Sequence, residues 1–554
     1  MNSASRACIW TKSLVVVLTV AIVLVSFPGY VANATGTRVY VGHRARLSAQ
    51  IPVSWTVPSD GRADYAGEDG FVVSASIPGN DLQDACDNAT QSWNWGDIRS
   101  RLEREHGEDT CLLEGQLNGR ELRGVVLVHP APFNVSGQTF GFVELIADPD
   151  HFDAIRSSVS FDPADVTPQL YAESVLDIIE ARAWYAPDVD WDLVRDGPLG
   201  MLENAESYDD VHWVIRQALQ RLRDWGDNHS FFVSYDQTLE DRVLPDTGMI
   251  LQGRVVYLVF PDGPAGRAGI QTGDTIEAVN GERFNGTRWI EELVGLGATL
   301  TVSRHGEAAP FEVEVIPGSF SPYLKPIATP IDDVGYVELF TDVGADQIQY
   351  ATDANDGIAR IQDDVACGWI LDLRRNGGGG YFSMTIGTEA LLQDGNLLSF
   401  VRRDGTVAGR VDLHAGSMYQ DGLELTGNLD DVPRADRVAP GTPIAVLIGP
   451  ATASAAEATA VAYIGQPNTR LFGEKSGGYT VGNNGYLLFD GARLILAEST
   501  YVDGNGNQHI GGIVPDEVVK TDLQVYGTTD DPVIQAASVW LREQSGCDMA
   551  TPVP

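Results

Sequence analysis

The feature that most constrains the fold is a pair of apolar runs, each ending in a turn of small residues. Residues 443–448 lead through Gly449, Pro450 and a small-residue turn into an alanine-rich stretch at 455–462. Residues 368–374 lead through a run of four glycines, 377–380, into an expected helix at 383–392. Strand, tight turn and helix in this order are typical of a parallel sheet with crossover helices. The sequence therefore predicts an α/β core.

Ser454 lies in the first of these turns, where a hydroxyl can stand clear of the sheet. The free N–H groups at the start of the following helix can hold an anion, so the position suits a nucleophile. On its own, an alanine- and serine-rich helix start is more often plain packing than a catalytic turn. The glycine run can point backbone N–H groups at a ligand oxygen. A phosphate loop is the alternative, but the Lys-Ser/Thr pair of a P-loop is missing.

The chain has 554 residues, enough for three or four domains, and a formal net charge of -40. Its only lysines are Lys12, Lys325, Lys475 and Lys520. Such an acidic chain is a poor partner for nucleic acid and for anionic membrane surfaces. The balance suits a secreted or salt-tolerant protein.

The first 34 residues have the layout of a secretory signal peptide. Arg6 and Lys12 precede an apolar stretch at 13–27, and residues 32–34 fit a small-residue cleavage site. An uncleaved membrane anchor is the alternative, although the apolar stretch is short for a full span. We expect a secreted or cell-envelope protein with no stable membrane insertion after signal removal.

Five cysteines are present, and Cys8 would leave with the signal. Cys86 and Cys111 fall within one expected domain, and an exported protein could pair them. Cys367 precedes a buried strand and is expected to be an inert core thiol, with a bridge to Cys547 as the alternative. The spacing is not that of a zinc site, and we expect no metal, nucleotide or other cofactor.

Residues 35–163 are expected to form an α+β accessory or binding module, with strands at 71–75, 125–128 and 140–146 and a charged helix at 97–106. Its ending, at 148–161, resembles PsbP-like modules. Residues 164–235 are expected to be a helical segment, with a clear apolar face at 211–222. His229 follows the end of that last helix, where its side chain is either oriented toward a functional site or simply exposed on the surface.

Residues 240–317 carry a glycine-rich pattern that resembles PDZ modules. It runs from Gly263-Pro264-Ala265 through Gly273-Asp274 to Asn280-Gly281. The exposed edge of such a sheet accepts an extended peptide as an added strand. A β module that only packs against its neighbours is the alternative.

Residues 318–523 are expected to form the α/β core, with an inserted β-rich excursion at 395–440. Residues 524–554 form a C-terminal helix and tail. The whole pattern over 165–545 resembles the tail-specific, or carboxyl-terminal processing, serine peptidases and their tricorn-core relatives. The resemblance rests on five ordered matches: residues 227–230, the PDZ run, residues 372–379, residues 454–457, and residues 473–474 with 512–516.

The resemblance implies a role for each matched residue. Ser454 would be the nucleophile, and the oxyanion hole would combine the N–H of Ala455 with that of Gly378 or Gly379. The processing branch uses a lysine where this chain has Tyr479, whereas the tricorn-like branch uses a histidine that matches His229.

His229 is therefore the expected general base, with Lys475 as the alternative. The glutamate of the tricorn-like pattern has no clear match, although Asp503 and Glu498 are nearby candidates. The sequence thus predicts a multidomain α/β protein that acts as an exported serine endopeptidase on polypeptides, whose C-termini the PDZ-like module would recognise. A non-catalytic binder of peptides or apolar ligands on a peptidase scaffold is one rival. A partner-recognition role for residues 35–163 is another.

Overall fold

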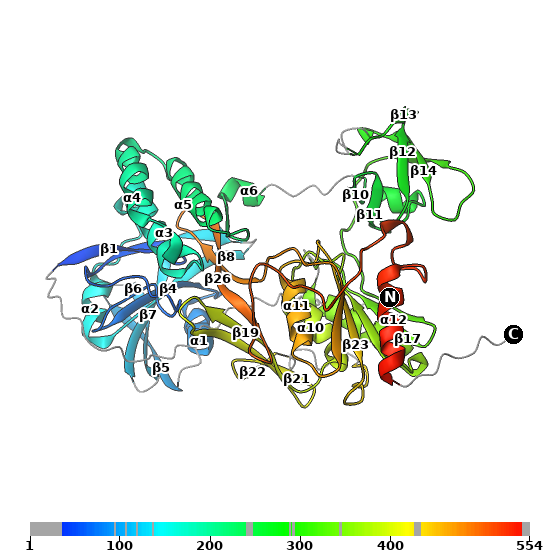
Figure 1. Ribbon diagram of the computed structural model, residues 1–554. Helices are drawn as coiled ribbons and strands as arrows, with labels where there is room; N and C mark the ends of the chain where they lie inside the picture. The colour runs from blue at the N-terminus through cyan, green and yellow to red at the C-terminus, as the bar shows by residue number, and fades with distance from the viewer. Residues whose placement is uncertain are drawn as a thin grey trace, which may run out of the picture. The chain divides into compact units, whose positions relative to one another are not determined.

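The structure is a computed structural model that describes residues 36–545, apart from 93–95, 106–107, 118–119, 136–137, 240–246, 287–289, 291–293, 343–345 and 426–433. The expected signal peptide and Cys547 lie outside the described residues. The chain forms two compact units (Figure 1). The first holds residues up to 239 together with 484–496, and the second holds 240–483 and the chain from 497 onward.

An antiparallel sheet of six strands organises the first unit, in the order β3-β4-β8-β7-β6-β5. Three apolar clusters lie against it: one contains Val72 and Leu145, and two smaller ones contain Val73 and Ile77. Strand residues alternate between faces, so neighbours such as Val72 and Val73 join different clusters. The strands are β3 (Tyr65–Ala66), β4 (Phe71–Ile77), β5 (Gly96–Glu105), β6 (Glu108–Leu117), β7 (Arg120–Val135) and β8 (Gln138–Ala147).

Helices and a hairpin complete the first unit. The hairpin of β1 (Thr37–Gly42) and β2 (Leu47–Pro52) shares the largest apolar cluster with Phe152 of α2 (Pro149–Ser157). Helices α3, α4 and α5 contact one another, and β9 pairs with residues 493–495. These elements are α3 (Pro168–Arg182), α4 (Trp191–Gly200), α5 (His212–Asp224), β9 (Phe231–Val233) and the short α6 (Tyr235–Leu239).

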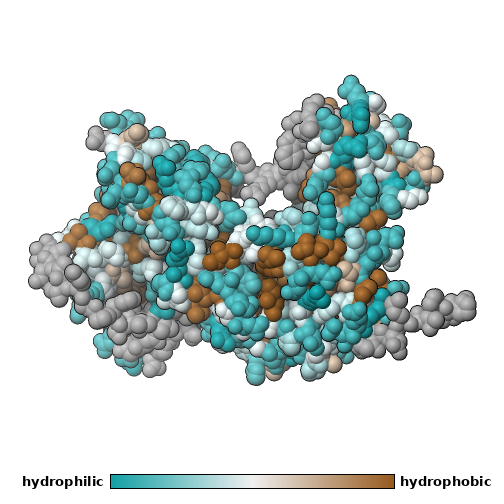
Figure 2. All heavy atoms as spheres, in the orientation of Figure 1, coloured by the Kyte–Doolittle hydropathy of each residue, from teal (hydrophilic) through white to brown (hydrophobic). Residues whose placement is uncertain are grey.

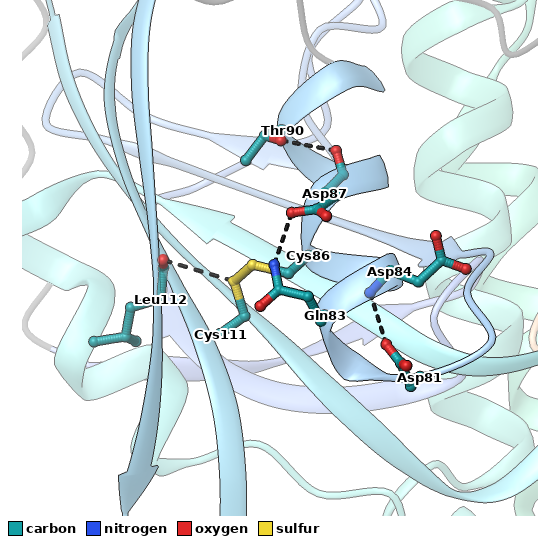
Figure 3. The surroundings of a disulfide bond; sticks show 8 residues. All are labelled: Asp81, Gln83, Asp84, Cys86, Asp87, Thr90, Cys111 and Leu112. Atoms are coloured by element: carbon teal, nitrogen blue, oxygen red, sulfur yellow. Dashed lines mark hydrogen bonds between the residues drawn. A yellow bond between two sulfur atoms is a disulfide. The ribbon is translucent and has the colours of Figure 1, made fainter.

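A disulfide joins Cys86 of α1 (Leu82–Ser92) to Cys111 of β6 (Figure 3). The turn before the helix is closed by Asp81, whose carboxylate accepts the N–H of Asp84 at 2.9 Å. The bridge therefore ties α1 to the sheet at a buried position. Cys367 is also disulfide-bonded, so the expectation of an inert core thiol was wrong.

The expected helix at 97–106 was also wrong, because residues 97–105 belong to β5. Its residues pair with β6, for example Arg101 with Leu112 and Leu102 with Cys111. Arginine and glutamate favour a helix in isolation, but pairing along a neighbouring strand outweighs that weak preference.

The second unit begins with an antiparallel sheet in the order β10-β11-β12-β14-β15, to which β13 is added. Its own apolar core includes Val256, Ile276 and Leu300. A Cβ on Gly266 would lie 2.3 Å from the carbonyl oxygen of Phe260, so this turn requires glycine. The elements are β10 (Met249–Gln252), β11 (Val255–Val259), α7 (Pro264–Arg267), β12 (Thr275–Val279), β13 (Glu282–Arg283), β14 (Ala298–Ser303) and β15 (Phe311–Val315).

The expected α/β core follows, with the strand order β16-β17-β18-β23-β24-β28. Strands β17, β18, β23, β24 and β28 are parallel, and β16 is antiparallel at one edge. Every residue of β18 and β23 is buried, as expected for parallel strands that are covered on both faces. The strands are β16 (Ile327–Ile331), β17 (Val334–Glu338), β18 (Trp369–Asp372), β23 (Ile444–Ile448), β24 (Thr469–Gly473) and β28 (Glu517–Val518).

Helices cover the core sheet. One apolar cluster joins it to α9 (Gln347–Ile361), α10 (Tyr381–Gly387) and α11 (Ala455–Ile464), and another joins it to α12 (Pro532–Ser545). Every residue of α11 from Ala455 to Tyr463 is buried.

The β-rich excursion is confirmed in its described residues, and the first of its four strands pairs with β26 (Arg493–Asp503). Its strands are β19 (Gly395–Arg402), β20 (Val407–His414), β21 (Ser417–Gln420) and β22 (Leu423–Glu424). The strands β25 (Val481–Leu487) and β27 (Gln508–His509) belong to the same sheet.

The face of the molecule in Figure 2 is covered mainly by hydrophilic residues, in keeping with the net charge of -40. In the described part of the chain, no helix combines the length and apolar character needed to cross a membrane.

Candidate active site

Three loops meet where the parallel strands β18, β23 and β24 end. The N–H of Ala453 donates to the carbonyl oxygen of Asn376 at 3.1 Å, and the N–H of Gly477 donates to that of Thr452 at 2.8 Å. The Thr452 hydroxyl donates to the carbonyl oxygen of Leu373 at 2.8 Å. Ligands of α/β sheets commonly bind at the carboxyl ends of the strands. The serine turn, the glycine turn and the loop after β24 therefore form one site.

Ser454 occupies the N-cap position of α11 with φ 54° and ψ -119°. A positive φ is unfavourable for a residue with a Cβ, and such residues concentrate at functional sites. The side chain of Ser454 is partly exposed, whereas the next residue, Ala455, is buried. The backbone thus holds the Ser454 hydroxyl at the start of a buried helix, in a conformation that the surroundings must stabilise.

The carboxylate of Glu457 supplies that stabilisation. Glu457 is 0 % exposed, and its Oε2 accepts the N–H of Ser454 at 3.0 Å. Its Oε1 accepts the Ser476 hydroxyl at 2.5 Å and the Gly478 N–H at 2.9 Å. Burial raises the pKa of Glu457, and the hydrogen bonds from Ser476 and Gly478 oppose that rise. The bond to Ser454 is local, whereas the partners Ser476 and Gly478 lie in the loop after β24, about twenty residues further along the chain.

Of the two expected oxyanion glycines, Gly378 lies beside the serine. A Cβ on Gly378 would lie 2.9 Å from the Cβ of Ser454 and 3.2 Å from the nitrogen of Ala455. The N–H of Gly378 donates to Oδ1 of Asn376 at 2.9 Å. Gly379 instead approaches Asp342, since a Cβ there would lie 2.0 Å from the carbonyl oxygen of Asp342. Both glycines have φ above 100° (110° and 122°), which a side chain would strain.

The loop after β24 carries the alternative base. Lys475 is exposed, and its Cε would lie 3.1 Å from a Cβ on Gly512. Lys475 therefore lacks the burial that a lysine general base requires. Tyr479, at the position of the processing-branch lysine, is partly buried.

His229 belongs to the first unit, just beyond α5. The carboxylate of Asp227, 2 % exposed, accepts the backbone N–H groups of His229 at 2.9 Å and Ser230 at 2.8 Å, which shapes this loop. Burial lowers the pKa of His229 below its ordinary value, and Asp227 opposes the change only in part. The imidazole is consequently neutral near pH 7, the form in which it can accept a proton.

The two candidate carboxylates lie on β26, and Asp503 already has other partners. Its carboxylate accepts the N–H groups of Asn505 and Asn507 and lies 3.0 Å from Nε2 of His509. Burial by itself would raise the pKa of Asp503, but these hydrogen bonds hold it below its ordinary value. Glu498 is buried, at 4 % exposure.

A buried ion pair anchors the glycine turn to the β10–β15 domain, a link that no sequence pattern indicated. Arg375 pairs with Glu338 at 2.8 Å and donates to the Thr272 hydroxyl at 2.6 Å and to the carbonyl oxygen of Tyr257 at 3.3 Å. The Tyr257 hydroxyl donates back to the carbonyl oxygen of Arg374 at 3.0 Å. Arg375, the residue before Asn376, is therefore held by contacts with both the α/β core and the β10–β15 domain. Across the described residues, no group of three or more histidine, cysteine, aspartate or glutamate side chains could hold a metal ion.

Comparison with known proteins identifies both domains of the second unit. Residues 333–519 match the profile of Peptidase family S41, and residues 255–298 match that of a PDZ domain. The carboxy-terminal-processing protease of Bartonella bacilliformis is 27% identical over 285 residues, which are 49% of this chain and 60% of that protein. The nisin-resistance protein of Lactococcus lactis subsp. lactis is 29% identical over 233 residues, 42% of this chain and 68% of that protein.

Solved structures of low identity are also similar. A putative S41 protease from Bacteroides fragilis has 20% identity and a TM-score of 0.48, covering 67% of this chain and 97% of its own. The tricorn protease has 15% identity and a TM-score of 0.36, covering 90% of this chain and 48% of its own. The chain spans 60% of the length of the Bartonella relative. From the two profile matches, the chain carries a PDZ domain followed by a Peptidase family S41 core, as the resemblance in its motifs predicted.

Proposed function

We propose that this chain is an exported serine endopeptidase with Ser454 as its nucleophile. The observation that carries the proposal is the positive φ of Ser454 at the start of α11, with Gly378 in contact beside it. A strained serine at a helix start, beside a glycine turn whose backbone is not covered by side chains, is an arrangement that acyl transfer can use. The two named relatives are a carboxy-terminal-processing protease and a nisin-resistance protein.

In the proposed reaction, the Ser454 hydroxyl attacks a peptide carbonyl carbon while His229 takes its proton. The N–H of Ala455 and one N–H of the glycine turn stabilise the oxyanion. Gly378 is the glycine beside Ser454, and its N–H would have to leave Oδ1 of Asn376 to reach the oxyanion. His229 then gives the proton to the leaving amine, and water hydrolyses the acyl-enzyme.

Polypeptides are the proposed substrates, and the PDZ domain is the proposed reader of their C-termini. A PDZ sheet binds an extended peptide along its edge through main-chain hydrogen bonds. The bonds from Arg375 to Thr272, to Tyr257 and to Glu338 link the PDZ domain to the residue before the glycine turn, which supports this proposal.

The direct test is cleavage of casein by the wild type and by Ser454→Ala, His229→Ala and Lys475→Ala. We expect the first two substitutions to abolish cleavage and the third to leave it unchanged. Loss of cleavage in Lys475→Ala alone would move the base to Lys475. Full activity in a folded Ser454→Ala variant would refute the mechanism.

A non-catalytic binder is the second candidate, because Tyr479 stands where the processing branch has its lysine. Labelling with a fluorophosphonate distinguishes the two. A peptidase should be labelled in the wild type and not in Ser454→Ala, whereas a binder should show no labelling that depends on Ser454.

A further inference from the structure

The first unit contains a pocket that the proposed reaction does not use. Its volume is 340 Å³, which lies within the range of ligand-binding pockets. All of its lining residues belong to the first unit, including Tyr486 and Leu487. Much of the lining is apolar, with Glu144 buried at 2 % exposure and Arg44 exposed.

The pocket lies against the free edge of β4. Strand β3 pairs only with Phe71 and Val72, and β8 pairs with the other side of β4 from Val72 to Ile77. In the ranges that the structure describes, no strand pairs with β4 beyond Val72 on the β3 side.

The hydrogen bonds establish which backbone groups face that edge. The carbonyl oxygen of Val72 accepts the N–H of Asp64 at 2.9 Å, and the N–H of Ser74 donates to the Asp64 carboxylate at 2.9 Å. Because backbone direction alternates along an antiparallel strand, the N–H and C=O of Ser76 also point away from β8. Ser76 is partly exposed and lines the pocket.

Side chains from both faces of the sheet line this pocket. Val41, Tyr65 and Ile178 belong to the large apolar cluster, whereas Val73 and Ile77 belong to the two smaller ones. An added strand places successive side chains on opposite faces, so it would fill both halves. A pocket that wraps around an open strand edge matches an extended peptide better than a compact molecule that sits on one face.

We propose that the edge of β4 binds an extended polypeptide segment by strand addition. The backbone groups of Ser76 pair with the segment, and its alternating apolar side chains enter the two halves of the pocket. The four positions from Ser74 to Ile77 span about 10–13 Å, room for three to four residues of an added strand. Arg44 at the rim favours an acidic residue at one end of the segment.

In the proposed peptidase, this site would bind unfolded substrate in the first unit, whereas Ser454 belongs to the second, and this role rests on the proposed function. The binding itself does not depend on the proposed function, so it is tested in the full chain carrying Ser454→Ala. The probe is a fluorescent peptide of alternating valine and threonine that ends in two glutamates. Fluorescence anisotropy gives the Kd in this background with Ser76→Pro, Ser76→Ala and Ala75→Phe added.

Ser76→Pro removes the edge N–H, and proline is tolerated on a strand edge that faces outward. We expect it to weaken binding at least tenfold, while Ser76→Ala, which keeps the N–H, stays within twofold. Ala75→Phe fills the pocket from a neighbouring lining position and should also weaken binding at least tenfold. If the melting curve of Ser76→Pro shows that this variant fails to fold, Ala75→Phe alone tests the proposal.

Equal affinity in all folded variants, or no measurable binding, would overturn the proposal. Binding of decanoate that competes with the peptide and survives Ser76→Pro would overturn it in favour of a small apolar ligand. Activity of the parent chain on casein is measured separately, so failure of peptide binding and failure of the peptidase mechanism are distinguishable.

Discussion

Glu457→Gln tests whether a buried carboxylate holds the nucleophile in place. In the wild type, Oε1 accepts from Ser476 and Gly478 while Oε2 accepts from Ser454. Glutamine can keep its carbonyl oxygen toward Ser476 and Gly478. Its side-chain NH2 group then faces the backbone N–H of Ser454, and because both groups are donors, they form no hydrogen bond. One buried N–H is left without an acceptor, which costs about 1–3 kcal/mol.

The same hydrogen bond helps to hold Ser454 at φ 54° and ψ -119°, a sparsely populated conformation that costs about 1–3 kcal/mol for a residue with a Cβ. Without the bond, the turn can relax and move the hydroxyl. A displacement of about 1 Å at the reacting atom can cost about 100-fold in rate. We therefore expect kcat/KM on casein-derived peptides to fall about 100-fold, with stability in urea lower by about 2 kcal/mol.

The matched control is Glu389→Gln, at a carboxylate that is 5 % exposed and whose pKa burial raises to about 7. Its side chain is already partly neutral at pH 7, so the amide should change stability by less than about 1 kcal/mol and leave kcat/KM unchanged. If Glu457→Gln kept kcat/KM within threefold of the wild type, the carboxylate would not position the serine. Equal losses in both variants would show a general effect of altering a buried carboxylate.

Three further predictions follow from individual contacts. At Gly378, which has φ 110°, substitution by alanine places a methyl group 2.9 Å from the Cβ of Ser454 and should lower kcat/KM at least 100-fold. The control is Gly377→Ala, whose new methyl group has its nearest contact at 3.4 Å, and its kcat/KM should stay within threefold of the wild type. Burial lowers the pKa of His43 from 6.5 to about 4, so the folded state binds fewer protons than the unfolded state between these values. Urea titrations should show the first unit losing about 3 kcal/mol as the pH falls from 6.5 to 4, and a slope unchanged in His43→Asn would contradict this. Cys86→Ser opens a bridge with a sequence separation of 25 and should destabilise the first unit by about 3.5 kcal/mol in calorimetry, whereas a change below 1 kcal/mol would refute the chain-entropy estimate.

Much of the second unit was predictable because its signals are local. The apolar runs at 368–374 and 443–448 became β18 and β23, and the inserted β-rich excursion was also correct. The capping box that joins Ser454 to Glu457 spans three residues and can be read from the sequence.

The errors came from interactions between distant residues. The segment 97–106 has the composition of a helix, but pairing with β6 made residues 97–105 part of a strand. Cys367 is disulfide-bonded rather than a free core thiol. The role of Asp503 stays a prediction, although its carboxylate already accepts hydrogen bonds within its own hairpin and lies 3.0 Å from Nε2 of His509.

The sequence by itself determined the order of domains, the strand-to-helix turn that carries Ser454 and the glycine turn that accompanies it. These features depend on hydrophobic runs and turn residues within a few positions of one another. Only the tertiary structure decided that Ser454 has a positive φ, that Glu457 ties it to Ser476 and that Arg375 joins the glycine turn to the PDZ domain. Those outcomes depend on hydrogen bonds and burial between segments separated by up to about a hundred residues, and no local pattern encodes which partners will meet.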